Sequence, residues 1–156
     1  MKLDFTELVL QTSAEYEEKF EERNLTEIQH LPKEKALVYI DGRRTWRILA
    51  NLYNNAAKYA MTGSRIYTDL KVTEGAVIFS IKNISEQPLN INADQLTERF
   101  IRGDISRSTE GSGLGLSIAQ TLTEMQKGKF ELYLDGDLFK ATVTFPKVQE
   151  EQSTQI

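Results

Sequence analysis

The chain has 156 residues, a net charge of -4, 40% hydrophobic residues and 27% charged residues. This length predicts a single domain, and the ordinary composition argues against disorder and fibrous repeats. The negative charge gives no general attraction to nucleic acid or to an anionic membrane, so we expect no nucleic acid and no direct membrane contact. The chain has no cysteine, which excludes disulfides, thiolate catalysis and zinc fingers, and one histidine, His30, whose strand-like context favours a surface histidine over a catalytic triad.

The first half of the chain predicts two helices that alternate with short strands. Asp4 can cap a helix that runs to about Glu22, and short strands follow over 25–31 and 36–40. Asp41 begins a second helix that runs to about Met61. Alternating runs over 66–72 and 76–81 then predict a hairpin in which Gly75 adopts a positive φ. The second helix carries its apolar residues on one side, at Thr45, Ile48, Leu49, Leu52, Tyr53 and Ala56.

The second half predicts a long polar connection, a third main helix and a final hairpin. Residues 83–92 have the composition of a loop, 93–100 fit a short helix, and 103–113 fit a mobile polar loop. Helical spacing returns over 114–127, and strands over 129–134 and 138–145 flank the turn sequence Asp135-Gly136. We expect the polar tail, 148–156, to be disordered. This order predicts an α/β fold with two layers, helices against one mixed sheet.

The second helix carries a polar stripe beside its apolar side. Asn51, Asn55 and Lys58 have i, i+4, i+7 spacing, and Arg44 and Arg47 extend the stripe toward the start of the helix. An amide oxygen suits Mg²⁺, and a lysine one turn further on suits a phosphate that the metal also contacts. An ordinary solvated polar face has the same pattern, so the stripe alone leaves both interpretations open.

A glycine-rich segment, Gly-Ser-Gly-Leu-Gly-Leu over 111–116, leads into the third main helix. Such a segment exposes backbone N–H groups at a helix N-terminus, where an anionic phosphate chain can bind. Just before it, Arg99, Arg102 and Arg107 supply guanidinium groups that suit phosphate oxygens. A flexible hinge and a solvated charged loop are the alternatives.

The order of these segments resembles one protein family. Asn-Leu-Tyr-Asn-Asn-Ala-Ala-Lys-Tyr-Ala (51–60) resembles the N box of sensor histidine kinases, and Glu-Arg-Phe-Ile-Arg-Gly-Asp-Ile-Ser-Arg (98–107) resembles their F box. Residues 111–116 match the second glycine box. From about Asp4 to Pro146 the chain therefore resembles the catalytic, ATP-binding domain of a histidine kinase. The resemblance implies a domain over 1–147 with the Bergerat ATPase fold, a mixed and mostly antiparallel sheet covered by about three helices on one face.

The resemblance also implies roles for single residues. Asn55 corresponds to the Mg²⁺-binding asparagine, Arg102 to the arginine that reaches the terminal phosphate, and the loop over 103–113 to the ATP lid. Lys58 joins these two as the residues expected to support catalysis. The full set expected at the nucleotide is Asn51, Asn55, Lys58, Tyr59, Asn83, Arg102, Arg107, Gly111, Gly113, Leu114, Gly115 and Leu116.

Two positions depart from related sequences. The first glycine box of the family reads Asp-x-Gly-x-Gly, whereas this chain has Asn-Ile-Ser-Glu-Gln over 83–87. Asn83 keeps an oxygen acceptor for an adenine amine but loses the charge, and the two glycines are missing. Gyrase-type ATPases and anti-sigma-factor serine kinases carry Glu four residues before the metal-binding asparagine. Asn51 stands there in this chain, and an amide cannot act as a general base.

By this resemblance we expect the domain to bind Mg²⁺ and ATP and to donate the γ-phosphate to a histidine on a separate dimerisation domain. The parent would be a homodimeric, membrane-anchored sensor whose cytoplasmic portion includes this chain. A response regulator would be an indirect partner of the chain. Two alternatives belong to other classes, an anti-sigma-factor-type serine kinase and a degenerate, nucleotide-independent interaction module.

Overall fold

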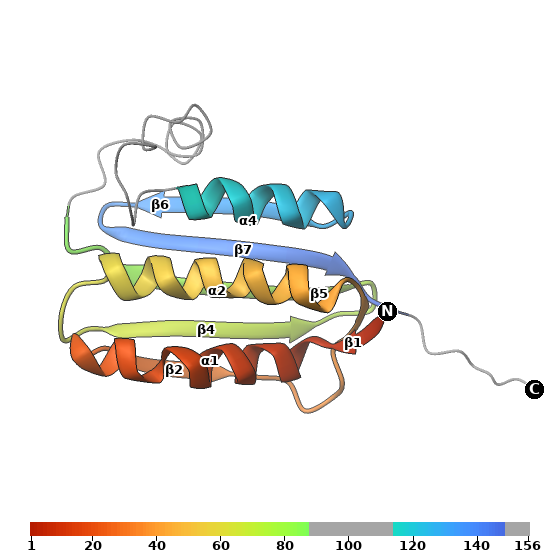
Figure 1. The fold of residues 1–156 in the computed structure, drawn as a ribbon, viewed down its shortest axis with the longest axis horizontal. Helices are drawn as coiled ribbons and strands as arrows, with labels where there is room; N and C mark the ends of the chain where they lie inside the picture. The colour runs from red at the N-terminus through yellow and green to blue at the C-terminus, as the bar shows by residue number, and fades with distance from the viewer. Residues whose placement is uncertain (88–113, 149–156) are drawn as a thin grey trace, which may run out of the picture.

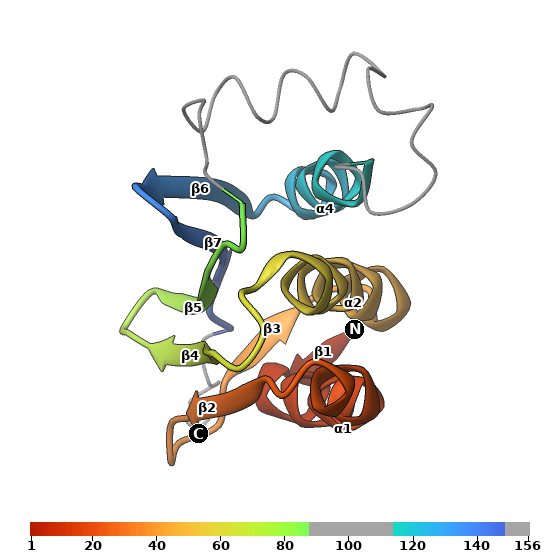
Figure 2. The same ribbon diagram turned by 90° about the vertical axis from the view of Figure 1, so that its left-hand side faces the viewer.

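The computed structural model describes residues 1–87 and 114–148, and their helices and strands form two layers (Figures 1 and 2). In the described part of the chain, three helices cover one side of a five-stranded sheet, and a pair of short strands forms a second sheet. The helices are α1 (Phe5–Glu22), α2 (Gly42–Tyr59) and α4 (Leu114–Met125). The main sheet contains β2 (Thr26–His30), β4 (Arg65–Val72), β5 (Ala76–Ile84), β6 (Lys129–Asp135) and β7 (Leu138–Pro146), and the small sheet pairs β1 (Lys2–Asp4) with β3 (Leu37–Tyr39).

The main sheet is mixed and mostly antiparallel. Its strand order is β2-β4-β5-β7-β6, in which β2 and β4 are parallel and the other neighbours are antiparallel. Figure 2 shows α1, α2 and α4 together on one side of these strands. The predicted fold class is therefore confirmed.

Side-chain caps begin the first two helices as their sequences predict. Asp4 accepts a hydrogen bond from the backbone N–H of Thr6 at 3.1 Å, and Asp41 accepts one from Arg44 N–H at 2.9 Å. The bond from Arg44 holds the pKa of the Asp41 carboxyl below its usual value. Each carboxylate satisfies a donor that the first turn leaves without an intrahelical partner.

The core lies between α1, α2 and the sheet, and Tyr53 of α2 is at its centre. Its ring stacks on Phe20 with 5.9 Å between centroids and on Phe79 with 6.4 Å. Its hydroxyl donates to Glu27 Oε2 at 2.7 Å, and Thr68 donates to the same oxygen at 2.8 Å. Burial, and next the charge of Glu27, raise the pKa of Tyr53 far above its usual value. The apolar side predicted for α2 is buried along its length.

The structure differs from the prediction at the end of β5. Asn83 and Ile84 were expected in a loop, but they continue the strand and pair with Phe139 and Leu138 of β7. Asn, Ser and Pro give this stretch the composition of a turn, yet the cross-strand hydrogen bonds of a long β7 outweigh that local preference. Placing Asn83 in a loop was therefore wrong.

Three smaller corrections concern turns and ends. Gly75 does not have a positive φ; Thr73 instead closes the turn by donating its backbone N–H to the Ala76 carbonyl at 2.8 Å. Strand β1 was not predicted. Val148, expected in the tail, donates its backbone N–H to Leu37 O at 2.9 Å. The short helix predicted over 93–100, the polar loop over 103–113 and the rest of the tail lie outside the described residues.

Candidate functional site

Three elements that carry predicted site residues end or begin at the same edge of the domain. Figure 1 shows the C-terminal end of α2, the C-terminal end of β5 and the N-terminal end of α4 at its left-hand side. Backbone hydrogen bonds join the first two: Met61 N–H donates to Ile84 O and Glu86 N–H donates to Tyr59 O, both at 2.8 Å. Residues far apart in the sequence thus meet at one edge.

Helix α2 supplies the polar stripe in the position that its spacing predicts. Asn51 and Asn55 are half-buried, whereas Lys58 and Tyr59 in the last turn are exposed. Arg44 and Arg47, toward the start of the helix, are exposed as well, so only the two asparagines in the middle of the stripe are partly enclosed. The stripe is therefore not the uniformly solvated face that was the alternative interpretation.

Asn51 lies directly against the start of α4. A Cβ added to Gly115 would sit 3.7 Å from both Cβ and Cγ of Asn51, which is ordinary van der Waals contact. The Nδ2 atom of Asn51 is buried and, as far as the described residues show, has no hydrogen-bond partner. A buried amide donor without a partner costs free energy, so this atom requires an acceptor such as a ligand oxygen. The prediction from the motifs that these two segments adjoin is supported here by direct contact.

Asn83 points into the helix-covered side of the sheet at the end of β5. It is only 4% exposed, and its neighbours on that side of the strand, Ile81 and Phe79, are core residues. Ser85, two residues after Asn83, forms a β-bridge with Ala60, the residue that follows α2. Asn83 therefore lies at the same edge as the last turn of α2, with an amide where the family pattern has a carboxylate.

Arg23 holds this edge together, although no sequence pattern indicates such a role. Its Nη1 donates to the Ala57 carbonyl at 2.7 Å, its Nη2 donates to Thr62 Oγ1 at 3.1 Å, and it forms an ion pair with Glu86. One guanidinium thus joins the end of α1, the end of α2 and the segment that follows β5. The contacts span 34 to 63 residues of sequence, so no local pattern predicts them.

The remaining predicted residues contribute less that can be described. Leu116 is 2% exposed, so its side chain belongs to the core and only its backbone is available to a ligand. Leu114 begins α4. Arg102, Arg107, Gly111 and Gly113 lie outside the described residues. Among the described residues no three His, Cys, Asp or Glu side chains are grouped in a way that could hold a metal ion.

Comparisons with known proteins identify relatives over nearly the whole chain. Residues 40–153 match the family described as histidine kinase-, DNA gyrase B- and HSP90-like ATPase. The histidine protein kinase SaeS of Staphylococcus aureus (strain USA300) is 30% identical over 152 residues, which is 94% of this chain and 43% of SaeS. The adaptive-response sensory kinase SasA of Thermosynechococcus vestitus is 28% identical over 82% of this chain and 34% of its own length. The chain spans less than half of either relative.

Solved structures show the same fold. The catalytic domain of histidine kinase ThkA superposes with a TM-score of 0.81 at 24% identity, covering 94% of this chain and 95% of that domain. Full-length ShkA in complex with AMPPNP superposes with a TM-score of 0.74 at 21% identity, covering 95% of this chain and 31% of ShkA. Across residues 1–87 and 114–148, no helix is both long and apolar enough to cross a membrane.

Proposed function

We propose that this chain binds Mg²⁺ and ATP at the edge where α2, β5 and α4 meet. The premise is that the chain belongs to the histidine kinase-, DNA gyrase B- and HSP90-like ATPase family and corresponds to the catalytic domain of a sensor histidine kinase. The observation that carries the proposal is the buried, unpartnered Nδ2 atom of Asn51 against Gly115. A phosphate oxygen would satisfy that donor. The AMPPNP bound to ShkA, an analogue of ATP, supports the choice of nucleotide.

Each described residue has a role that its position allows. The amide oxygen of Asn55, half-buried on α2, would hold Mg²⁺. Lys58, exposed one turn later, would neutralise charge on the phosphates, and Asn83 would accept a hydrogen bond from the adenine amine. The backbone N–H groups at the start of α4 add the partial positive charge of a helix N-terminus. Arg102 is proposed for the terminal phosphate.

The reaction proposed is transfer of the γ-phosphate to a histidine on a separate dimerisation domain. That phosphohistidine would then pass the phosphoryl group to a response regulator. Bound Mg²⁺ would neutralise charge that develops on the phosphates. The chain's own residues position and desolvate the nucleotide, since phosphoryl transfer needs little covalent chemistry from the protein. Asn51 supports this choice over a serine kinase, because the amide cannot remove a proton from a hydroxyl.

Calorimetric titration of Mg·ATP into the chain, with two neighbouring asparagines compared, tests the binding step. Asn55→Ala is expected to weaken binding at least about tenfold, or about 1.4 kcal/mol. Asn54→Ala removes the same amide one position away, outside the stripe, and is expected to leave the affinity within about twofold. Equal losses in both variants would refute the role of Asn55.

The transfer step needs its own measurement. Incubating the chain with radiolabelled ATP and a dimerisation domain that carries the phosphoacceptor histidine is expected to give an acid-labile, alkali-stable label on that domain. The degenerate interaction module remains the second candidate, because Asn83 replaces an aspartate and the first-box glycines are missing. Absence of measurable binding at millimolar nucleotide would favour that candidate.

A further inference from the structure

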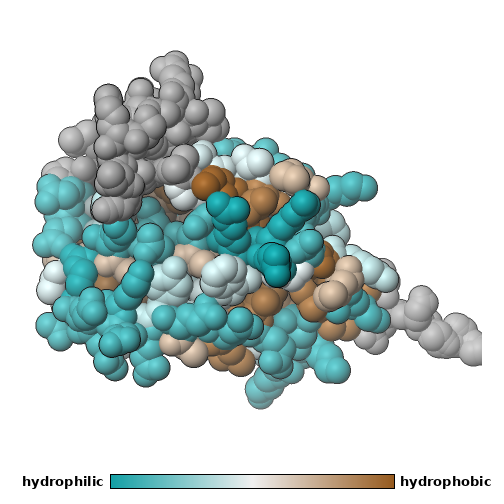
Figure 3. Space-filling model, viewed as in Figure 1, coloured by the Kyte–Doolittle hydropathy of each residue, from teal (hydrophilic) through white to brown (hydrophobic). Residues whose placement is uncertain are grey.

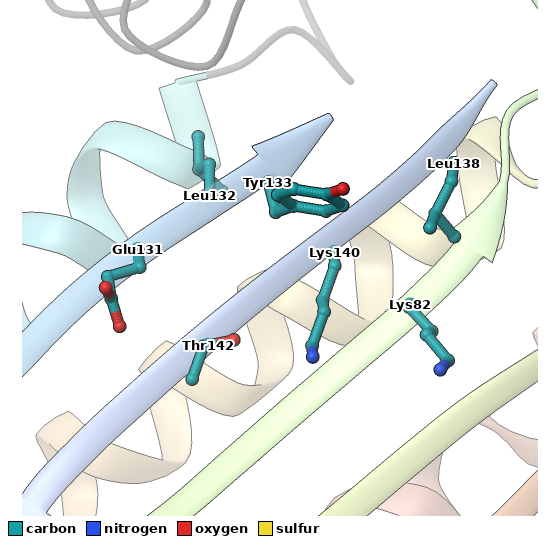
Figure 4. Close-up of a pocket in the computed structure, with 7 residues that line it drawn as sticks. All are labelled: Lys82, Glu131, Leu132, Tyr133, Leu138, Lys140 and Thr142. Atoms are coloured by element: carbon teal, nitrogen blue, oxygen red, sulfur yellow. The ribbon is translucent and has the colours of Figure 1, made fainter. Parts of the chain in front are cut away.

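The open face of the main sheet, opposite the helices, carries a row of four aligned side chains. Tyr67 of β4 pairs with Lys82 of β5, Lys82 pairs with Lys140 of β7, and Lys140 pairs with Tyr133 of β6. Residues directly opposite one another in a sheet point to the same face, so the four form a Tyr-Lys-Lys-Tyr row across four strands. Figure 4 shows Lys82, Lys140 and Tyr133 projecting side by side from neighbouring strands.

The two lysines at the centre of the row lack local compensation. Neighbouring strands lie about 4.8 Å apart, and like charges directly opposite each other destabilise a sheet. Lys82 contacts the face of the Tyr67 ring at 5.6 Å from its centroid. Within the described residues, neither Lys82 nor Lys140 forms an ion pair with a carboxylate.

Three acidic side chains on the same face have other partners. Asp69 contacts His30 Nδ1 at 2.7 Å, Glu131 contacts Lys129 Nζ at 3.5 Å, and Asp135 accepts a hydrogen bond from the Tyr133 hydroxyl at 3.3 Å. None of the three forms an ion pair with Lys82 or Lys140 within the described residues. The two like charges face each other at the centre of the open face, where an anionic group between them would relieve their repulsion.

The row borders a groove that combines apolar and charged side chains. The groove has a volume of about 390 Å³ and is lined on the open face by Leu138, Tyr133, Thr142, Glu131 and the two lysines. Leu132 also borders it, but this side chain packs against the core on the other side of the sheet. Tyr133 is 54% exposed, and Ile84, at the end of β5 beside Leu138, is 40% exposed. Figure 3 shows the helix-covered side of the molecule, where hydrophilic side chains predominate.

We propose that this groove binds an acidic segment of a partner protein, with carboxylates between Lys82 and Lys140 and an apolar side chain against Leu138 and Tyr133. Leu138 and Ile84, which pair with each other on this face, favour a polypeptide, because a nucleic acid backbone offers no aliphatic side chain to cover them. The groove is on the face opposite the proposed nucleotide site, so the proposal does not depend on that site.

One substitution separates binding from stability. Lys140→Glu places a carboxylate opposite Lys82 and replaces a repulsive pair with an attractive one, so the melting temperature is expected to stay unchanged or rise. The same variant changes the charge of the pair from +2 to 0 and so removes the net positive charge that would attract an anion. Lys71→Glu is the matched control, because Lys71 is exposed on the same face of β4 near the far end of the strand.

The probe is a short peptide of repeated Glu-Glu-Leu units, added to ¹⁵N-labelled protein at low salt. We expect amide chemical-shift changes centred on residues 82, 133 and 138–140. The peptide affinity should fall at least about tenfold in Lys140→Glu and stay within about twofold of the parent value in Lys71→Glu. Binding should also weaken as salt rises, because exposed charges are screened. Equal losses in both variants, shifts elsewhere, or oligothymidylate binding as tightly as the peptide would each overturn the proposal.

Discussion

Two glycine-to-alanine substitutions at opposite ends of α4 should separate the stability of the fold from the binding of nucleotide. A Cβ at Gly128, just after the helix, would lie 2.6 Å from Phe145 Cε1 and 2.9 Å from Thr123 Cγ2. Phe145 is 1% exposed and Thr123 is fully buried, so neither neighbour has space to move. Overpacking of this kind costs about 1–3 kcal/mol. For a domain of this size that corresponds to a melting temperature lower by about 2–12 °C.

Gly115→Ala makes the opposite prediction. The nearest atoms to its added Cβ belong to Asn51 at 3.7 Å, so the fold accepts the methyl group without strain. Alanine is also the better helix former, by up to about 1 kcal/mol, so stability should stay the same or rise. The new methyl group would however occupy space beside the unpartnered amide of Asn51. We expect affinity for Mg·ATP to fall at least about tenfold.

Urea unfolding and calorimetric titration of both variants and the parent chain provide the measurements. The reasoning predicts that Gly128→Ala loses stability and that Gly115→Ala loses affinity without losing stability. A Gly128→Ala variant within about 0.3 kcal/mol of the parent would show that Phe145 and Thr123 relax freely, contrary to a close-packed core. Unchanged affinity in Gly115→Ala would show that the contact between α2 and α4 is purely structural.

The other predictions test the edge of the domain, the core and one strained turn. Arg23→Gln should remove the contacts with Ala57 and Glu86 and lower the unfolding free energy by about 1 kcal/mol, a modest loss because the guanidinium is partly exposed. The same variant should weaken nucleotide binding. If calorimetry gives an unchanged Kd, Arg23 contributes to the stability of the fold and not to binding. Tyr53 has a raised pKa in the folded state, so its contribution to stability should be constant below about pH 10 and fall at higher pH by up to about 1.4 kcal/mol per pH unit. Urea unfolding of Tyr53→Phe at several alkaline pH values should therefore give a smaller slope of unfolding free energy against pH. Lys127 has a φ of 65°, a left-handed conformation that glycine adopts with less strain than other residues. Lys127→Gly should therefore raise the unfolding free energy measured in urea by about 0.5–1 kcal/mol. A decrease would contradict the assignment of strain.

Helix α2 was predictable because its own side chains determine its position. Its apolar residues recur every three or four positions, so one side is buried whatever its neighbours are, and Asp41 marks its start. The polar stripe of Asn51 and Asn55 follows from the same period. In contrast, the end of β5 depends on β7, which is more than fifty residues away in sequence, and the turn-like composition after Ile81 conceals the pairing.

The contact between Asn51 and Gly115 came from family resemblance and not from spacing, because nothing local to either segment specifies the other. Arg23 was missed for a related reason. Its partners Ala57 and Glu86 are a backbone carbonyl and an ordinary surface carboxylate, neither of which has a recognisable pattern. Sequence periodicity thus predicts which side of an element is buried, whereas side-chain contacts between elements require the folded chain.

The Arg23 contact also addresses an electrostatic difficulty of the proposed nucleotide site. The C-terminus of α2 carries partial negative charge on its last carbonyls, at the edge where an anionic phosphate chain would have to bind. Three of the last four carbonyls are satisfied: Ala56 O by Ala60 N–H, Ala57 O by the Arg23 guanidinium and Tyr59 O by Glu86 N–H. Lys58 adds positive charge in the same turn. With these carbonyls paired, less of the partial negative charge of the helix C-terminus faces the site, and the backbone N–H groups at the start of α4 and Lys58 supply positive charge, although Glu86 offsets the charge of Arg23. A helix C-terminus thereby becomes compatible with an anion beside it.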